Sequence, residues 1–378
     1  MKNKNIYLMY AIAFLQGMIF YGPIATLYRQ AHGVSILQIT IIESISLILC
    51  LLLEFPWGII ADKIGYKQTI LFCCVLYFLS KIVFWQADRF SMFLLERIML
   101  SVVIAGLSGV DSAFLYLSCQ KEESLKVFGI YESLQTAGLL FAALVFSTFV
   151  GSNYPLAGLL TVISYGIAGL LALGLREVHR QETKSPNGQK ILGLLKQVAK
   201  DRNLLLFLVG IALFQETHQT ITVFLSQLQY TKCGLSPAAM GYIYILVTII
   251  GLCSALSPKF THKLGIPRFI FFLFFATTLS CLLLSFTESP WFSIAGILIL
   301  RLAFSLFQPL QTELQNRRIL TQNRATILSI YAVVIDSVGA GTNILFGMLA
   351  NTSLEAALLL GAGLSIAGGF LVMRYVKK

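Results

Sequence analysis

The chain has 378 residues, of which 57% are hydrophobic and only 12% are charged. A soluble domain of this length leaves roughly a quarter of its unfolded surface in contact with water, which is too much for so apolar a sequence. The composition therefore excludes a soluble enzyme, a secreted disulfide scaffold and a disordered chain. It indicates a membrane protein that crosses the bilayer many times.

Apolar stretches long enough to cross a bilayer recur along the whole chain. We predict twelve membrane-spanning helices and therefore an all-α membrane fold, and we interpret the first stretch as a helix instead of a cleaved signal peptide. The predicted spans cover residues 6–28, 36–60, 68–87, 91–118, 127–150, 156–175, 204–228, 237–257, 269–287, 290–312, 325–350 and 354–373.

Lysine and arginine are divided unequally between the two sides of these spans. The side of the N-terminus has 22 of them and the other side has 3, while Lys81, Arg97 and Arg301 lie within spans. Positive residues concentrate in cytoplasmic loops, so both termini are predicted to be cytoplasmic. The net charge of +11 is thereby interpreted as an orientation signal, and nucleic acid is not an expected partner.

One long polar connection divides the predicted spans into two groups of six. It contains the turn sequence Ser185-Pro186-Asn187-Gly188, and residues 191–200 after it are apolar on one face and basic on the other. That pattern predicts a short helix on the cytoplasmic surface. We predict an N-terminal six-helix bundle (1–175), a cytoplasmic linker (176–203) and a C-terminal six-helix bundle (204–378), the layout of transporters built from two repeats.

The connection after the second span carries a short charged motif, in which a glycine permits close helix contact and a second glycine permits a tight turn. Its residues are Gly58, Asp62, Lys63, Gly65 and Lys67. The motif resembles the cytoplasmic signature G-x-x-x-D-[RK]-x-G-[RK]-[RK] of the major facilitator superfamily, with Tyr66 in place of one basic residue. The resemblance implies the major facilitator fold, transport by alternating access, and a loop that helps to close the cytoplasmic side.

Other parts of the chain repeat or extend this resemblance. Lys263 and Gly265, after the eighth span, follow Lys63 and Gly65 by 200 positions. The segments 324–329 (R-A-T-I-L-S) and 109–113 (G-V-D-S-A) look like motifs of a poorly characterised bacterial group of the superfamily. The resemblance therefore implies a bacterial plasma membrane as the location.

Ionisable residues inside a membrane are costly, about 2.5–3.5 kcal/mol each on insertion scales, so each one needs a compensating role. Lys81 lies near the outer end of its span, where its long side chain is predicted to extend to the interface. Three glutamates lie near inner ends of spans, and we favour contacts of a cytoplasmic gate over a substrate role for them. With the motif residues above and Arg324, the predicted gate thus includes Glu54, Glu132 and Glu313.

The seventh span contains six consecutive hydrogen-bonding residues, 215–220, near its centre. Such a run facing lipid would be prohibitively unfavourable, so it must contact water, a substrate or another polar span. We predict that Gln215 and Gln219, one helical turn apart, face a substrate cavity. Glu216 is the first candidate for a group that binds and releases a proton, and His218 is a weaker one. The alternative is a cluster of interhelical hydrogen bonds.

Further candidates for proton coupling are spread over other spans. Asp111 is the second carboxylate that we assign to coupling. Asp336 is the third, and for it a cavity role and a packing role are equally favoured. Arg97 resembles the arginine of another facilitator motif and is expected to pair with Glu43 or, only weakly, with its neighbour Glu96. The remaining cavity candidates, for which packing is the alternative role, are Gln16, Tyr21, Arg301, Gln308 and Gln311. Gly17 and Gly22-Pro23 are expected to bend the first span.

These features predict a secondary active transporter, with proton-coupled efflux of an amphipathic drug-like or metabolite molecule favoured. Proton- or sodium-coupled or uncoupled uptake of a small nutrient is the alternative, and a membrane sensor or a lipid-modifying enzyme is a remote one. The sequence has no nucleotide-binding loop or hydrolase motif, so we expect no enzyme activity and no cofactor beyond the proton gradient. Seven cysteines without a C-x-x-C pair indicate neither disulfides nor a metal site. A monomer in the bilayer with a small-molecule substrate is expected.

Overall fold

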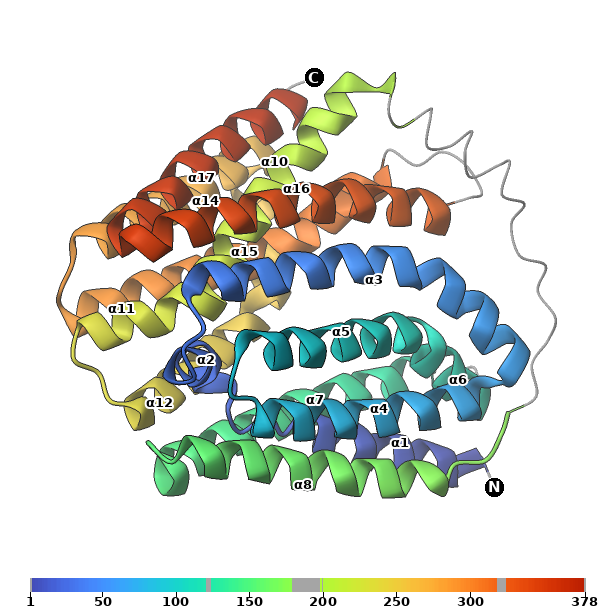
Figure 1. The fold of residues 1–378 in the computed structure, drawn as a ribbon. Coiled ribbons are helices and arrows are strands. Elements are labelled where there is room, and N and C mark those ends of the chain that lie inside the picture. The colour runs from blue at the N-terminus through green and yellow to red at the C-terminus, as the bar shows by residue number, and fades with distance from the viewer. Residues whose placement is uncertain (1, 120–123, 179–197, 199, 318–323, 377–378) are drawn as a thin grey trace. The chain divides into compact units, whose positions relative to one another are not determined.

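The computed structural model describes residues 2–119, 124–178, 198, 200–317 and 324–376 (Figure 1). None of these residues forms a strand, and they include twelve helical stretches that are long and apolar enough to cross a membrane. The predicted all-α fold class and the number of spans are confirmed. The predicted surface helix over residues 191–200 lies almost wholly outside the described residues.

The chain forms two compact units. Unit 1 comprises residues 1–35, 45–182 and 236–245, and unit 2 comprises residues 36–44, 183–235 and 246–378. Each unit therefore takes a short segment from the other half of the sequence.

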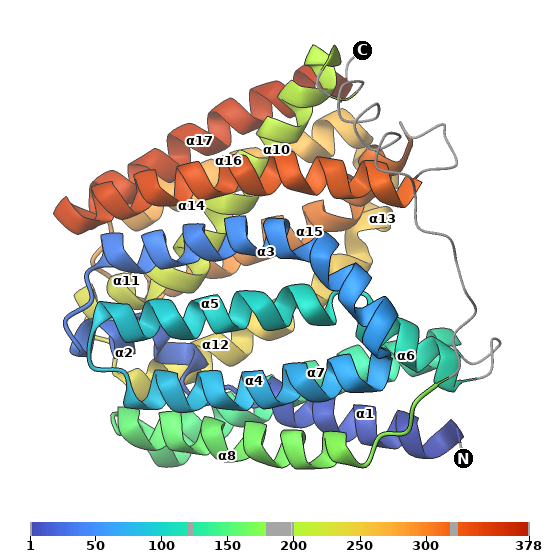
Figure 2. The same cartoon turned by 45° about the vertical axis from the view of Figure 1, so that its right-hand side comes forward.

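Unit 1 is built mainly from the first six spans. Within it, α1 packs against α7 and α8, while α4 packs against α5 and α8 (Figures 1 and 2). The helices of the first half are α1 (Lys2–Gly17), α2 (Ala25–Ala31), α3 (Ile36–Ile64, whose first residues belong to unit 2), α4 (Tyr66–Gln86), α5 (Phe90–Leu107), α6 (Val110–Ser118), α7 (Ser124–Val145) and α8 (Tyr154–Leu173).

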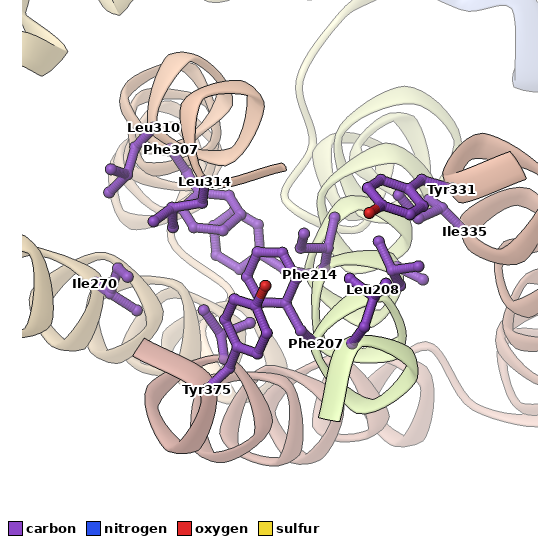
Figure 3. Packing of buried hydrophobic residues seen from close by; sticks show 14 of the residues in the cluster. Phe207, Leu208, Phe214, Ile270, Phe307, Leu310, Leu314, Tyr331, Ile335 and Tyr375 are labelled. Atoms are coloured by element: carbon purple, nitrogen blue, oxygen red, sulfur yellow. The ribbon is translucent and has the colours of Figure 1, made fainter. Parts of the chain in front are cut away.

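Unit 2 is built mainly from the last six spans, and α17 in it packs against both α10 and α14. An aromatic core holds these helices together: Phe207 of α10 stacks on Tyr375 of α17, with ring centroids 4.1 Å apart (Figure 3). The helices of the second half are α10 (Arg202–Gln219), α11 (Ser226–Lys232), α12 (Pro237–Gly251, whose first residues belong to unit 1), α13 (Ser257–Leu264), α14 (Ile266–Phe286), α15 (Pro290–Arg317), α16 (Arg324–Thr352) and α17 (Leu354–Val376).

The first span is interrupted near its middle, where Gly17 and the Gly22-Pro23 pair predicted a bend. Helix α1 ends at Gly17, and a 3₁₀ turn at Gly22–Ile24 leads into α2. Side chains of α8 bond the backbone groups at the interruption: the Ser164 hydroxyl donates to the Leu15 carbonyl at 2.6 Å, and the Tyr165 hydroxyl donates to the Gln16 carbonyl at 2.6 Å. Such partners are what allow a broken helix inside a membrane.

The loops that carry the repeated Lys-x-Gly sequence have the same backbone conformation in both halves. Gly65 precedes α4 with φ 93° and ψ 155°, and Gly265 precedes α14 with φ 77° and ψ 149°. These positive φ values are accessible to glycine and strained for other residues. The correspondence seen in the sequence therefore reflects a shared turn in the two repeats.

Close contact between α1 and α7 depends on two glycines. A Cβ atom at Gly138 would overlap the Phe14 carbonyl oxygen, and a Cβ atom at Gly17 would overlap the Gln135 carbonyl oxygen. Small residues at helix interfaces allow this approach in membranes, where packing has to replace much of the hydrophobic driving force. The interface between the first and fifth spans is thus specified by these glycines.

We predict that Gly138→Ala lowers the free energy of unfolding by about 1–3 kcal/mol, the usual cost of overpacking a tight contact. The measurement is the unfolding midpoint of the purified protein in detergent. The matched control is Gly129→Ala on the same helix, because a Cβ atom there meets nothing within 4 Å. Equal stability of the two variants would contradict the proposed role of Gly138.

Candidate functional site

The polar run of the seventh span is buried within unit 2. Glu216 is 7% exposed and accepts a hydrogen bond of 2.6 Å from the Thr220 hydroxyl, one helical turn further along. The same hydroxyl lies 3.3 Å from the side-chain oxygen of Asn343 on α16. Thr220 begins a π-helical segment, η4 (Thr220–Leu225), and such irregular turns are frequent at functional sites. Thr220 therefore connects Glu216 with a polar side chain of α16.

Two other acidic side chains of unit 2 influence Glu216. The carboxyl groups of Glu43 on α3 and Asp336 on α16 are close enough to interact with it electrostatically. Glu43 is buried and Asp336 is half-buried. In the part of the chain that the structure describes, no lysine, arginine or histidine forms a salt bridge with Glu216. Three of the predicted coupling residues are thus brought together within unit 2.

His218 has a different environment, on the side of α10 that faces α15. Its ring stacks on Phe304 with centroids 3.9 Å apart and an interplanar angle of 4°. The side chain is 3% exposed, and neither ring nitrogen has a hydrogen-bond partner. Arg301, one turn before Phe304, is close enough to oppose a positive charge on the ring. The structure thus places His218 in an aromatic contact with α15, and its coupling role stays a prediction.

The glutamines predicted for the cavity lie on α10 and α15 of unit 2. On α10, Gln215 is half-buried and Gln219 is exposed. On α15, Gln308 is exposed, whereas Gln311 is 7% exposed and its side-chain oxygen has no hydrogen-bond partner. The cavity role of all four stays a prediction.

A second polar cluster, which the sequence did not indicate, lies inside unit 1. Lys81 on α4 is 3% exposed, and its ammonium group lies 3.5 Å from a carboxylate oxygen of Glu96 on α5, which is 1% exposed. The ammonium group also donates a 3.0 Å hydrogen bond to the Tyr21 hydroxyl. The prediction that Lys81 extends to the membrane interface is therefore wrong, because a carboxylate and tyrosines inside the unit compensate its charge.

The two cavity candidates of the first span flank the interruption of that span. Tyr21 is buried and stacks on Phe84, with centroids 3.9 Å apart. Gln16 is half-buried, and its amide nitrogen lies 3.4 Å from the sulfur of Cys74. Both residues are thus tied to α4 in this structure.

Asp111 and Arg97 lie on the two helices that form the fourth span of unit 1. Gly109, with φ 78°, separates α5 from α6, and Asp111 lies in the first turn of α6. The Tyr131 hydroxyl of α7 donates to the Asp111 carboxylate at 3.4 Å. Arg97 is half-buried on α5. Its predicted pairing with Glu43 joins residues of the two units and stays a prediction, as does the coupling role of Asp111.

The cytoplasmic motif gains a partner that sequence reasoning missed. Both carboxylate oxygens of Glu177 lie 3.2 Å from the backbone N–H of Lys67 in the first turn of α4. A Cβ atom at Gly65 would come within 2.8 Å of the same carboxylate. An acidic group is favourable at a helix N-terminus, so Glu177 fixes the end of α4 next to the motif. Only the position of Glu177 just after the sixth span could have suggested this.

The other predicted gate residues are less constrained. Lys63 and Glu132 are exposed, and Glu313 pairs with Arg317 at 2.5 Å on its own helix. Gly58 lies within α3. The side chains of Glu54, Asp62 and Arg324 lie outside the described ones, so their gate role stays a prediction.

Replacing Glu177 with alanine is expected to destabilise the start of α4 by about 1 kcal/mol, the typical effect of losing a helix cap. Hydrogen exchange of the backbone amides of residues 66–69 should accelerate about fivefold. A loss of about 1 kcal/mol raises the equilibrium constant for local opening of the helix end by about that factor. Asp88→Ala serves as the control, because Asp88 is exposed and, in the described part of the chain, pairs only with its neighbour Arg89. Unchanged exchange in the Glu177 variant would contradict the capping role.

No group of three histidine, cysteine, aspartate or glutamate side chains able to hold a metal ion is found among the described residues. What the structure offers instead is a carboxyl group with hydroxyl and amide neighbours in unit 2 and an enclosed ion pair in unit 1. Together with the twelve spans and the broken first helix, these features are those of a membrane transporter.

Comparisons with known proteins agree with this class. The family model described as Major Facilitator Superfamily matches residues 6–343. The chain belongs to the major facilitator superfamily, and it is a transporter, not an enzyme. A search of curated proteins found no match.

Solved structures show the same fold at low sequence identity. The nucleoside transporter NupG has a TM-score of 0.80 at 17% identity, covering 99% of each chain. The D-xylose-proton symporter has a TM-score of 0.73 at 15% identity, covering 98% of this chain and 97% of that one. A bacterial homologue of the human lysosomal transporter Spinster, inward-facing and occupied, has a TM-score of 0.73 at 15% identity, covering 99% and 94%.

Proposed function

We propose that the protein is a proton-coupled secondary transporter in which Glu216 carries the coupling proton. The observation that supports this is the buried carboxyl group of Glu216, which has the Thr220 hydroxyl as its hydrogen-bond donor and no cationic partner among the described residues. Burying a carboxylate without a counter-charge is costly, and a bound proton removes that cost. Such a group is suited to coupling if it binds a proton from one side of the membrane while it is enclosed. It then releases the proton when it is exposed to water on the other side.

The proposed direction is export of an amphipathic drug-like or metabolite molecule from a bacterial cell, with both termini in the cytoplasm. The alternative is uptake of a small nutrient driven by protons or sodium. The oxygens of Glu216, Thr220 and Asn343 are also of the kind that sodium prefers, which is why sodium has to be tested. The structurally similar proteins include a nucleoside transporter and a D-xylose-proton symporter, so polar substrates belong in the test panel.

The test is substrate-dependent proton movement in proteoliposomes with an imposed pH gradient. A panel of drug-like cations, sugars and nucleosides is screened with gradients of either sign, and a sodium gradient is applied separately. A compound that dissipates the pH gradient only when the protein is present would support proton coupling, and the sign of the effective gradient would give the direction. Solute movement that follows only a sodium gradient, or no gradient at all, would overturn the proposal.

A further inference from the structure

The ion pair in unit 1 is enclosed by aromatic rings beside the interruption of the first span. The Lys81 ammonium group lies 5.4 Å from the ring centre of Tyr77 and 5.3 Å from that of Tyr165. It also lies 5.7 Å from the ring centre of Tyr21, and it donates to the Tyr21 hydroxyl. Attraction to the ring faces and to Glu96 offsets the cost of burying this cation.

Two hydrogen-bonding groups in this cluster are left unused. The Tyr21 hydroxyl accepts a hydrogen bond from Lys81, but no hydrogen bond donated by Tyr21 is found among the described residues. One oxygen of Glu96 faces Lys81, whereas the other, Oε2, is buried and has no hydrogen-bond partner among the described residues. An unmet hydrogen bond to a buried charged group is costly, so this free acceptor needs a donor.

We propose that Tyr21 and Glu96 bind a hydroxyl group of a transported solute. A hydroxyl group can both accept and donate a hydrogen bond. Its oxygen accepts a hydrogen bond from the Tyr21 hydroxyl, and its O–H donates a hydrogen bond to Oε2 of Glu96. Lys81 acts as a positioning residue, because its bond to the Tyr21 oxygen leaves the tyrosine proton directed elsewhere. The proposal rests on the protein being a transporter and is independent of the coupling role of Glu216.

The charges around the site determine which class of solute fits. Lys81 and Glu96 compensate each other's charge, so neither is free to pair with a charged group of a solute. Ring faces surround the polar groups, and apolar walls with few convergent polar groups are typical of small-molecule sites. The class is therefore a solute that is recognised through its hydroxyl groups. An ordered water molecule offers the same chemistry, and the experiment has to separate the two.

The experiment is calorimetric binding to the purified full-length protein in detergent, with no ion gradient. The probes are uridine and D-xylose, and 2′,3′-dideoxyuridine is the matched probe that lacks the ribose 2′ and 3′ hydroxyls. Tyr21→Phe removes the donor and keeps the ring on Phe84, and Glu96→Gln keeps the side-chain volume. The control is Tyr154→Phe, because Tyr154 is half-buried in the same unit and its ring packs against Tyr28.

We expect wild type and Tyr154→Phe to bind at least one hydroxyl-bearing probe. Tyr21→Phe and Glu96→Gln should bind it about tenfold more weakly or worse, as expected for a lost hydrogen bond to a charged or buried partner. If uridine is that probe, dideoxyuridine should bind weakly to wild type and lose nothing further in Tyr21→Phe.

Three results would overturn the proposal. The first is that wild type binds neither uridine nor D-xylose. The second is that a probe binds Tyr21→Phe and Glu96→Gln as tightly as wild type. The third is that the variants lose thermal stability but no affinity, which would show that the two groups hold a structural water only. Because no gradient is used, failure of proton coupling at Glu216 would leave all of these results unchanged.

Discussion

Glu216→Gln is expected to abolish substrate-dependent proton movement in proteoliposomes, reducing it to the level of liposomes without protein. Glutamine has nearly the same shape and can still accept the 2.6 Å hydrogen bond from Thr220, so the surroundings of the side chain are kept. It cannot bind and release a proton in the physiological range. The variant therefore removes the coupling group alone, and exchange of substrate in the absence of a gradient is expected to persist.

The controls separate coupling from folding. Asp88→Asn removes an exposed carboxylate whose salt bridge is with the neighbouring Arg89, so its proton flux should match that of wild type. Asp111→Asn and Asp336→Asn test the other coupling candidates. Asp336 interacts electrostatically with Glu216, so its replacement should shift the pH dependence of transport while leaving coupling in place. Undiminished proton flux in Glu216→Gln would contradict the assignment.

Much of the fold could be predicted because the bilayer imposes simple rules on a sequence. Twelve apolar stretches of sufficient length gave twelve spans, since backbone groups in lipid must bond within a helix. The interruption of the first span followed from Gly17 and Gly22-Pro23, which disfavour a continuous helix. The burial of Glu216 followed from a polar run that cannot face lipid.

The partners of these residues could not be predicted, because contacts between spans depend on helix rotation and packing that one sequence does not show. Thr220 and Asn343 are 123 residues apart, and no local pattern links them. The prediction for Lys81 was wrong for a related reason: its position near the end of a span is compatible with a side chain that extends to the membrane interface. Which face of α4 it lies on decided the outcome, and that face points into unit 1 toward Glu96.

Lys81→Met is expected to lower the free energy of unfolding by about 3–5 kcal/mol, the usual cost of removing one partner from a buried ion pair. Methionine fills much of the space of the lysine stem but leaves the Glu96 carboxylate without a cation, at a position that is 1% exposed. The Tyr21 hydroxyl also loses its donor. The measurement is the unfolding midpoint in detergent, and a variant as stable as wild type would contradict the pairing of Lys81 with Glu96.

The double variant Lys81→Met with Glu96→Leu shows what the ion pair is for. Removing both charges leaves no buried group uncompensated, so most of the lost stability should return, and the two substitutions should be strongly non-additive. If the pair served the fold alone, this variant would bind and transport as wild type does. We expect it instead to be stable and to bind the hydroxyl-bearing probe about tenfold more weakly or worse, because Oε2 of Glu96 is gone. Restored stability with lost affinity would show that an expensive buried charge is kept in this span for binding.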